Sequence, residues 1–143
     1  MNLTTMSQQY SYSAPRKLLE SHECEALVIT CIDFRFHETT SRFIREGLGI
    51  STFDLATSPG ACMRLNTDII TLSKRLHNIK QVVIVNHATC GAYGIKDPGA
   101  ELEAQSQDLR KADALLGDLF PDLSIKLFFA QKGNGEINYL EIK

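Results

Sequence analysis

Residues 81–91 read QVVIVNHATCG, and this stretch decides the fold class. Its first six residues are a short run rich in β-branched side chains, which is typical of a buried strand. His87 and Cys90 follow directly and lie three positions apart, so the turn that leaves the strand can point both side chains at one ion. The sequence therefore predicts a strand that ends in metal-capable side chains.

Strands and helices alternate along the rest of the chain. We expect further strands over residues 25–31, 52–57, 124–130 and 137–142, the last reached through a hairpin turn at 132–135. We expect helices over residues 16–22, 37–47, 67–76 and 101–119. This alternation predicts an α/β fold: a mostly parallel central sheet of four strands flanked by helices, with a C-terminal antiparallel edge strand.

Local signals refine two of these helices. Asn66 is expected to cap the third helix. The apolar side chains of the fourth helix are expected to face the core, and Pro121 stops that helix from continuing. These apolar residues are Leu109, Ala112, Leu115, Leu116 and Leu119.

The length of 143 residues fits one domain. Residues 1–14 are polar and without periodicity, so we expect an N-terminal arm with a short helix over residues 1–22. Residues 23–143 would then form a single domain.

Composition excludes several functional classes. Hydrophobic residues make up 43% and charged residues 22%, which is ordinary for a soluble globular protein. A formal net charge of -2 without a Lys/Arg cluster argues against a nucleic-acid partner. The apolar runs are too short to span a membrane, and the first fifteen residues lack a signal-peptide core. We therefore expect a cytoplasmic protein whose four cysteines stay reduced.

Chemically capable residues follow three of the predicted strands. Cys31, Asp33 and Arg35 follow the first strand, and His87 and Cys90 follow the third. The loop after the second strand reads Ser-Pro-Gly-Ala-Cys over residues 58–62. Because sites in such sheets form beyond the carboxyl ends of the strands, all three groups should meet at one edge.

These side chains suit a catalytic zinc ion. Cys31, His87 and Cys90 would supply three ligands and leave the fourth position open for water. Cys24 and Cys62 are interpreted as small buried hydrophobic side chains, although Cys62 could instead approach the metal.

Asp33 is the expected acceptor for a proton from that water. In an extended segment Cys31, Asp33 and Arg35 would point the same way, and Arg35 would hold the carboxylate through a bidentate ion pair. Three histidines are candidates for carrying the proton further, although an exposed histidine at a helix start is the plainer interpretation of His37. They are His22, His37 and His77.

Two motifs resemble those of the β-class carbonic anhydrases. Residues 31–35 look like the Cys-x-Asp-x-Arg motif of that family, and residues 87–91 are similar to its His-x-x-Cys-Gly motif. The resemblance implies zinc-dependent, reversible hydration of carbon dioxide to bicarbonate by a zinc-bound hydroxide. It also implies a homodimer or a larger homo-oligomer.

The resemblance assigns roles to individual residues. It implies Cys31, His87 and Cys90 as zinc ligands and Asp33 and Arg35 as a catalytic dyad. It further implies Gly60 and Gly91 as substrate-binding positions.

The loop over residues 59–62 departs from the Ala-Gly-Asn or Ala-Gly-Gly of the family, because it reads Pro-Gly-Ala-Cys. Two alternatives therefore stay open. One is a zinc hydrolase of carbonyl sulfide or carbon disulfide on the same scaffold. The other is a zinc-binding homologue without catalysis, which a fourth protein ligand would indicate.

Overall fold

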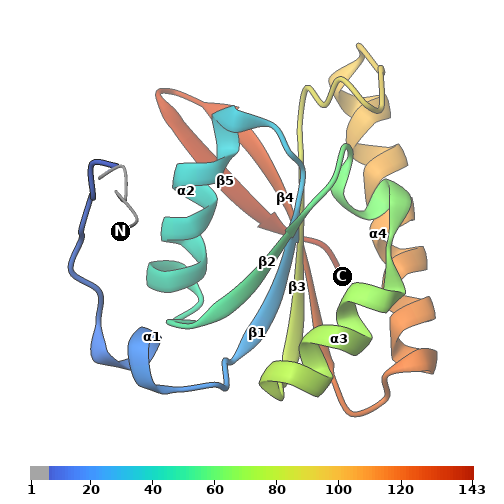
Figure 1. Ribbon diagram of the computed structural model, residues 1–143. Helices are drawn as coiled ribbons and strands as arrows, with labels where there is room; N and C mark the ends of the chain where they lie inside the picture. The colour runs from blue at the N-terminus through green and yellow to red at the C-terminus, as the bar shows by residue number, and fades with distance from the viewer. Residues whose placement is uncertain (1–6) are drawn as a thin grey trace, which may run out of the picture.

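The computed structural model describes residues 7–143 (Figure 1). The first six residues of the expected N-terminal arm lie outside the described residues. Residues 7–15 form neither helix nor strand and are exposed, and helix α1 (Arg16–Glu20) contains no buried residue. The division between an arm at 1–22 and a domain at 23–143 stays a prediction.

A five-stranded sheet forms the centre of the molecule, as the sequence predicts. The first four strands are parallel and β5 is antiparallel to β4, which confirms the predicted fold class. β4 extends three residues beyond the predicted end, because its hairpin with β5 pairs residues as far as Gly133 with Glu136. In spatial order the strands are β2 (Phe53–Thr57), β1 (Ala26–Thr30), β3 (Gln81–His87), β4 (Ser124–Gly133) and β5 (Glu136–Glu141).

Helices cover both faces of the sheet (Figure 1). Helix α2 (His37–Arg42) continues into the π-helical turn η2 (Phe43–Gly47) and packs on one face. Helices α3 (Thr67–His77) and α4 (Pro98–Leu119) pack on the other. Short 3₁₀ helices, η1 (Phe34–Phe36) and η3 (Ala61–Arg64), follow β1 and β2 at the edge where the predicted site residues lie.

β3 divides its side chains between the two hydrophobic cores. Val82 and Ile84 pack with α3 and α4, whereas Val83 and Val85 pack with the α2 side. All four are buried because each face of the sheet carries helices. This two-sided burial explains why the strand reads as a continuous apolar run rather than an alternating one.

Helix α4 begins three residues earlier than predicted. The Asp97 side chain accepts a hydrogen bond from the backbone N–H of Ala100 (2.8 Å), and Pro98 occupies the first helical position. Both are standard signals of a helix start. The predicted cap on α3 is confirmed, since Asn66 Oδ1 accepts from the N–H of Asp68 (3.0 Å).

The predicted inward face of α4 is partly wrong. Leu109, Ala112 and Leu116 are buried, but Leu115 and Leu119 are 46% and 52% exposed. The buried residues follow the i, i+3, i+7 spacing of one helix face. Leu115 lies beside that stripe, and Leu119 lies in the last turn of the helix.

Across residues 7–143, no helix combines the length and the apolar character that crossing a bilayer requires.

Two leucines on α4 test this assignment of the core. Replacing buried Leu109 with Ala should lower the free energy of unfolding by about 2–5 kcal/mol, because a cavity remains. Leu115→Ala on the same helix should cost only about 0.5 kcal/mol. Chemical denaturation of both variants measures the difference, and equal losses would contradict the packing.

Candidate metal centre

Three metal-capable residues meet at the carboxyl ends of β1 and β3. Cys31 is the first residue after β1, His87 is the last residue of β3, and Cys90 follows three positions later. The two strands are parallel neighbours with Thr30 opposite Val85, so their ends lie side by side. One ligand atom from each of the three residues lies within 4.8 Å of the others.

The distances within this group suit a tetrahedral ion. The sulfur atoms of Cys31 and Cys90 are 4.0 Å apart, close to the about 3.8 Å that two thiolates on one tetrahedral zinc would show. His87 Nδ1 bonds to the carbonyl oxygen of Ala88 (2.7 Å), which requires a proton on that nitrogen. His87 Nε2 therefore carries the free lone pair, and among residues 7–143 this buried nitrogen has no hydrogen-bond partner.

Burial also favours the neutral form of the imidazole. Cys31, His87 and Cys90 are only 7%, 3% and 4% exposed. Desolvation lowers the pKa of His87 and raises the pKa of the Cys90 thiol. The Phe36 ring stacks on the imidazole with 4.3 Å between ring centroids, which restrains its orientation. A neutral imidazole with a free nitrogen is ready to bind a metal, whereas the thiol must release its proton on binding.

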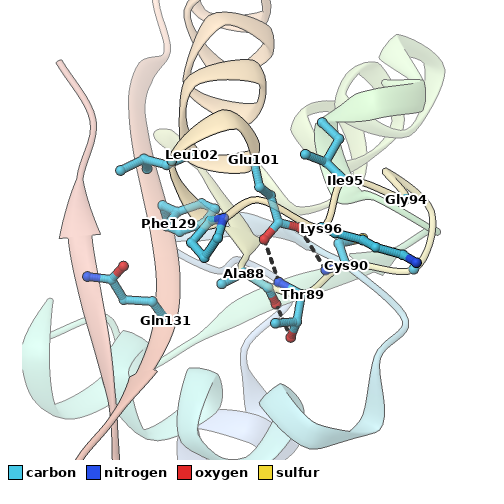
Figure 2. A pocket seen from close by; sticks show the side chains of 13 residues that line it. Ala88, Thr89, Cys90, Gly94, Ile95, Lys96, Glu101, Leu102, Phe129 and Gln131 are labelled. Carbon is cyan, nitrogen blue, oxygen red and sulfur yellow. Dashed lines mark hydrogen bonds between the residues drawn. The ribbon is translucent and has the colours of Figure 1, made fainter.

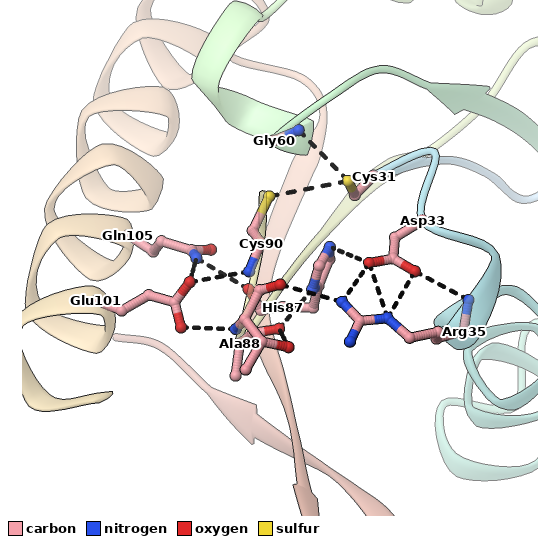
Figure 3. A network of polar contacts seen from close by, with 10 residues as sticks. Cys31, Asp33, Arg35, Gly60, His87, Ala88, Cys90, Glu101 and Gln105 are labelled. Carbon is pink, nitrogen blue, oxygen red and sulfur yellow. Dashed lines mark hydrogen bonds and ion pairs between the residues drawn. The ribbon is translucent and has the colours of Figure 1, made fainter. Parts of the chain in front are cut away.

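Asp33 and Arg35 form the predicted pair beside this group (Figure 3). Arg35 Nη2 donates to Asp33 Oδ2 (2.6 Å), and Arg35 Nε donates to both carboxylate oxygens (3.0 and 3.1 Å). The guanidinium hydrogen bonds hold the pKa of the Asp33 carboxyl well below its usual range. Asp33 Oδ2 lies 3.8 Å from His87 Nε2, so the carboxylate borders the space that the free nitrogen faces.

The pair forms by a different route from the predicted one. The segment after β1 is not extended, because Asp33 caps the 3₁₀ helix η1, in which Arg35 lies. The Asp33 side chain accepts from the backbone N–H of Arg35 (3.0 Å) as well as from its guanidinium. Arg35 Nη2 also donates to the carbonyl oxygen of Thr89 (3.0 Å), which links the loop after β1 to the loop after β3.

Gly60 and Gly91 border the site in different ways. The backbone N–H of Gly60 donates to Cys31 Sγ (3.4 Å). Gly60 has a φ of +76°, and a side chain there would come within 2.8 Å of Met63, so glycine suits this turn. Gly91 is exposed and lines a pocket of about 570 Å³ together with Asp33 and Arg35. Substrate contact by either glycine stays a prediction.

Cys62 lies outside the group of three potential ligands. It is buried in the core on the α3 and α4 face, and its backbone N–H donates to Asn86 Oδ1 (3.3 Å). This placement agrees with the plainer interpretation of Cys62 as a buried hydrophobic side chain. All four cysteines are free thiols.

Glu101 and Gln105 contribute to the site and were missed at the level of sequence. The two carboxylate oxygens of Glu101 accept from the backbone N–H groups of Thr89 (2.7 Å) and Cys90 (3.0 Å), as Figure 2 shows. Gln105 Nε2 donates to the carbonyl oxygen of His87 (2.9 Å). Both side chains are buried and project from the first eight residues of α4, so this helix fixes the loop that carries Cys90.

The histidines proposed as proton carriers are not gathered at this edge. His37 is exposed at the start of α2, in agreement with the plainer interpretation. His22 and His77 lie beside each other, with ring centroids 5.1 Å apart, before β1 and at the end of α3.

Comparison with known proteins identifies relatives of this chain. A family model described as "Putative carbonic anhydrase" matches residues 21–140. An uncharacterized protein of Rickettsia bellii is 31% identical, over 75% of this chain and 76% of its own length. A second uncharacterized protein, from Rickettsia conorii, is also 31% identical, over 75% of this chain and 67% of its own length.

Solved structures share the fold at low sequence identity. A carbonic anhydrase from Streptococcus mutans superposes with a TM-score of 0.61 at 17% identity, covering 94% of this chain and 88% of its own. A β-carbonic anhydrase of Aspergillus fumigatus gives a TM-score of 0.59 at 17% identity, covering 90% and 80%. Tetrameric β-carbonic anhydrases of Sordaria macrospora give 0.53 at 20% identity, covering 87% and 84%.

The family model matches residues 21–140 of the 143, and the Streptococcus mutans structure covers 94% of this chain. The chain therefore belongs to the family described as "Putative carbonic anhydrase", and its fold is that of the β-carbonic anhydrases.

Proposed function

We propose that this protein is a zinc-dependent carbonic anhydrase that interconverts carbon dioxide and bicarbonate. One observation carries the proposal: two buried thiols and an unpartnered imidazole nitrogen converge beside an arginine-held carboxylate. Family membership supports the same reaction class.

Cys31, His87 and Cys90 would hold the zinc ion. Zinc bound there would act as a Lewis acid and lower the pKa of water, which supplies a hydroxide nucleophile near neutral pH. Two thiolates and a neutral imidazole balance the charge of a divalent ion and so weaken its pull on that water. The chain must therefore provide a group that accepts the proton released by this water.

Asp33 is placed to accept this proton. Its carboxylate lies 3.8 Å from His87 Nε2 and is therefore within reach of a proton donor bound at the centre. Arg35 keeps the carboxylate ionised and oriented, because its guanidinium donates to both carboxylate oxygens. The same arginine is anchored on the Thr89 carbonyl, so the orientation depends on both loops.

The pocket beside the centre suits a small, weakly polar substrate. Its wall combines apolar side chains, among them Ile32, Pro59 and Ala92, with the charged pair Asp33 and Arg35. Carbon dioxide would rest against the apolar part, and bicarbonate would form next to the guanidinium. Gly91 borders open space in this pocket, because a Cβ there would meet no atom of residues 7–143 within 4 Å.

We also propose a homodimer or a larger homo-oligomer. Phe34 and Ile32 border the pocket and are strongly exposed, and a second copy of the chain would bury them. Tetrameric carbonic anhydrases occur among the structurally similar proteins. The cytoplasmic location expected from the sequence stays a prediction.

Zinc content tests the ligand assignment. Cys90→Ser should bind one zinc ion fewer per chain than the unchanged protein, because the loss of one thiolate opens the coordination sphere. Its thermal midpoint should also fall, since metal binding stabilises the folded state. Metal analysis and thermal unfolding measure both effects. Cys62→Ala is the matched control and should keep its zinc, whereas a loss there would show that Cys62 is a ligand.

Catalysis tests the role of Asp33. Asp33→Asn should retain zinc but lose carbon dioxide hydration by roughly 100-fold or more, because an amide cannot accept the proton. Stopped-flow hydration assays with a pH indicator measure the rate. Asp118→Asn, on the exposed face of α4, is the control and should keep the full rate.

Two outcomes of this assay would contradict the proposal. Full turnover in Asp33→Asn would remove the role of that carboxylate. Sulfide release from carbonyl sulfide by the unchanged, zinc-loaded protein, without carbon dioxide hydration, would assign a different substrate to the same centre.

Chelator competition tests how α4 supports the centre. Glu101→Gln should weaken zinc binding at the Cys90-dependent site by about 10–100-fold, because an amide offers one acceptor instead of two to the loop N–H groups. Glu103→Gln, an exposed change on the same helix, should leave zinc affinity unaltered. Equal affinity in the two variants would show that the Glu101 contacts do not position Cys90.

A further inference from the structure

A second group of metal-capable side chains lies at the opposite end of the strands, where β1 and β2 begin. Cys24 precedes β1, Asp54 is the second residue of β2, and His77 ends α3, at the lower end of the sheet in Figure 1. One potential ligand atom from each residue lies within 4.8 Å of the others. We propose that Cys24, Asp54 and His77 bind a second zinc ion, with a structural rather than a catalytic role.

The donor types select zinc among the common divalent metals. A thiolate, an imidazole nitrogen and a carboxylate oxygen are the three kinds of ligand found in protein zinc sites. Calcium and magnesium prefer oxygen ligands only, so the sulfur of Cys24 argues against them. A thiolate and a carboxylate with a neutral imidazole also balance the charge of a divalent ion.

Asp54 and His77 are already in hydrogen-bond contact with each other. His77 Nδ1 lies 2.9 and 2.7 Å from the two carboxylate oxygens of Asp54, and Ser73 Oγ donates to Asp54 Oδ2 (2.6 Å). On a tetrahedral zinc the nitrogen and the oxygen would be about 3.3 Å apart. The ion would therefore take the place of the direct contact between the two groups and separate them by about 0.5 Å, while Ser73 continues to orient the carboxylate.

The carboxyl end of α3 would favour a bound cation electrostatically. His77 is the last residue of this eleven-residue helix, and the backbone carbonyls at a helix end carry partial negative charge. The backbone N–H of Cys24 donates to the carbonyl oxygen of His77 (3.1 Å), which fixes the cysteine against the helix end. A cation held by Cys24 and His77 would lie next to these carbonyls.

His22 lies outside this group of three but beside His77, and its side chain would have to reorient to supply a fourth ligand. Its ring centroid is 5.1 Å from that of His77, and its Nδ1 lies 3.1 Å from the carbonyl oxygen of Leu76, so Nε2 is left for a metal. Four protein ligands are typical of structural zinc sites. The bound ion would tie the segment before β1 to β2 and α3.

The second site is independent of the proposed catalytic centre. The two groups lie at opposite ends of β1, whose five residues span about 17 Å. No residue belongs to both groups. The inference therefore does not rest on the proposed function.

Zinc stoichiometry in matched variants tests the inference. The full chain is saturated with zinc, freed of excess ion by gel filtration and analysed for metal per chain. The unchanged protein should hold two zinc ions, His77→Asn one, and His37→Asn two, because His37 is an exposed histidine outside both groups. Circular dichroism confirms that each variant is folded.

Cobalt provides a second measurement that isolates Cys24. In a protein with Cys31→Ser and Cys90→Ser, added Co²⁺ should still produce a thiolate-to-cobalt absorption band. Adding Cys24→Ser to that protein should abolish the band. A band that survives the removal of Cys24 would overturn the assignment.

The outcomes separate this inference from the proposed function. A single zinc ion that persists in His77→Asn and disappears in Cys90→Ser would overturn the second site and leave the first intact. A single ion that persists in Cys90→Ser and disappears in His77→Asn would support the second site and remove the metal from the proposed catalytic centre.

Discussion

The parallel pairing of β1 with β3 is the constraint on which the site depends. Their register places Thr30 opposite Val85, so the residues that follow both strands emerge side by side at one edge. Cys31 and Cys90 are 59 positions apart in sequence, and only this pairing brings their sulfur atoms to 4.0 Å. Both strands are buried on two faces, and a slip of one residue would exchange those faces and displace the three potential ligands. Core packing and metal geometry therefore select the same register.

The candidate metal centre also depends on how the negative charge of the buried Glu101 carboxylate is compensated. Glu101 is buried, and its oxygens are occupied by the N–H groups of Thr89 and Cys90 rather than by a cation. Such contacts satisfy a buried carboxylate only while the loop keeps its conformation. The loop is thus held from α4 through Glu101 and from η1 through Arg35, which donates to the Thr89 carbonyl. Two helical elements on different faces of the sheet position one metal-capable loop.

The sequence predicted the sheet and the composition of the site, but not its supporting contacts. Apolar β-branched runs identified the strands, and the position of Cys31 and His87 just after strands identified the edge. The start of α4 had a local signal, Asp97 followed by Pro98, that would have corrected the helix boundary. The contacts of Glu101 and the proposed role of Cys24 had no such signal, because each depends on the distance to residues far along the chain. The pairing of Asp33 with Arg35 was predicted correctly from a wrong backbone conformation, since a cap on η1 forms the same contact.

The two candidate metal sites, at opposite ends of β1, differ in the residue that pairs with the carboxylate, and this partner decides what the carboxylate can do. Asp33 is paired with Arg35, a permanently charged group that has no lone pair for a metal, so this carboxylate is held as an ionised acceptor beside three other potential ligands. Asp54 is paired with His77, whose neutral imidazole is itself able to bind a metal. An arginine partner therefore preserves a carboxylate for proton transfer, whereas a histidine partner allows carboxylate and imidazole to coordinate together. Similar residue types at the two ends of β1 are in this way suited to different tasks, an open reactive centre at one end and a closed structural one at the other.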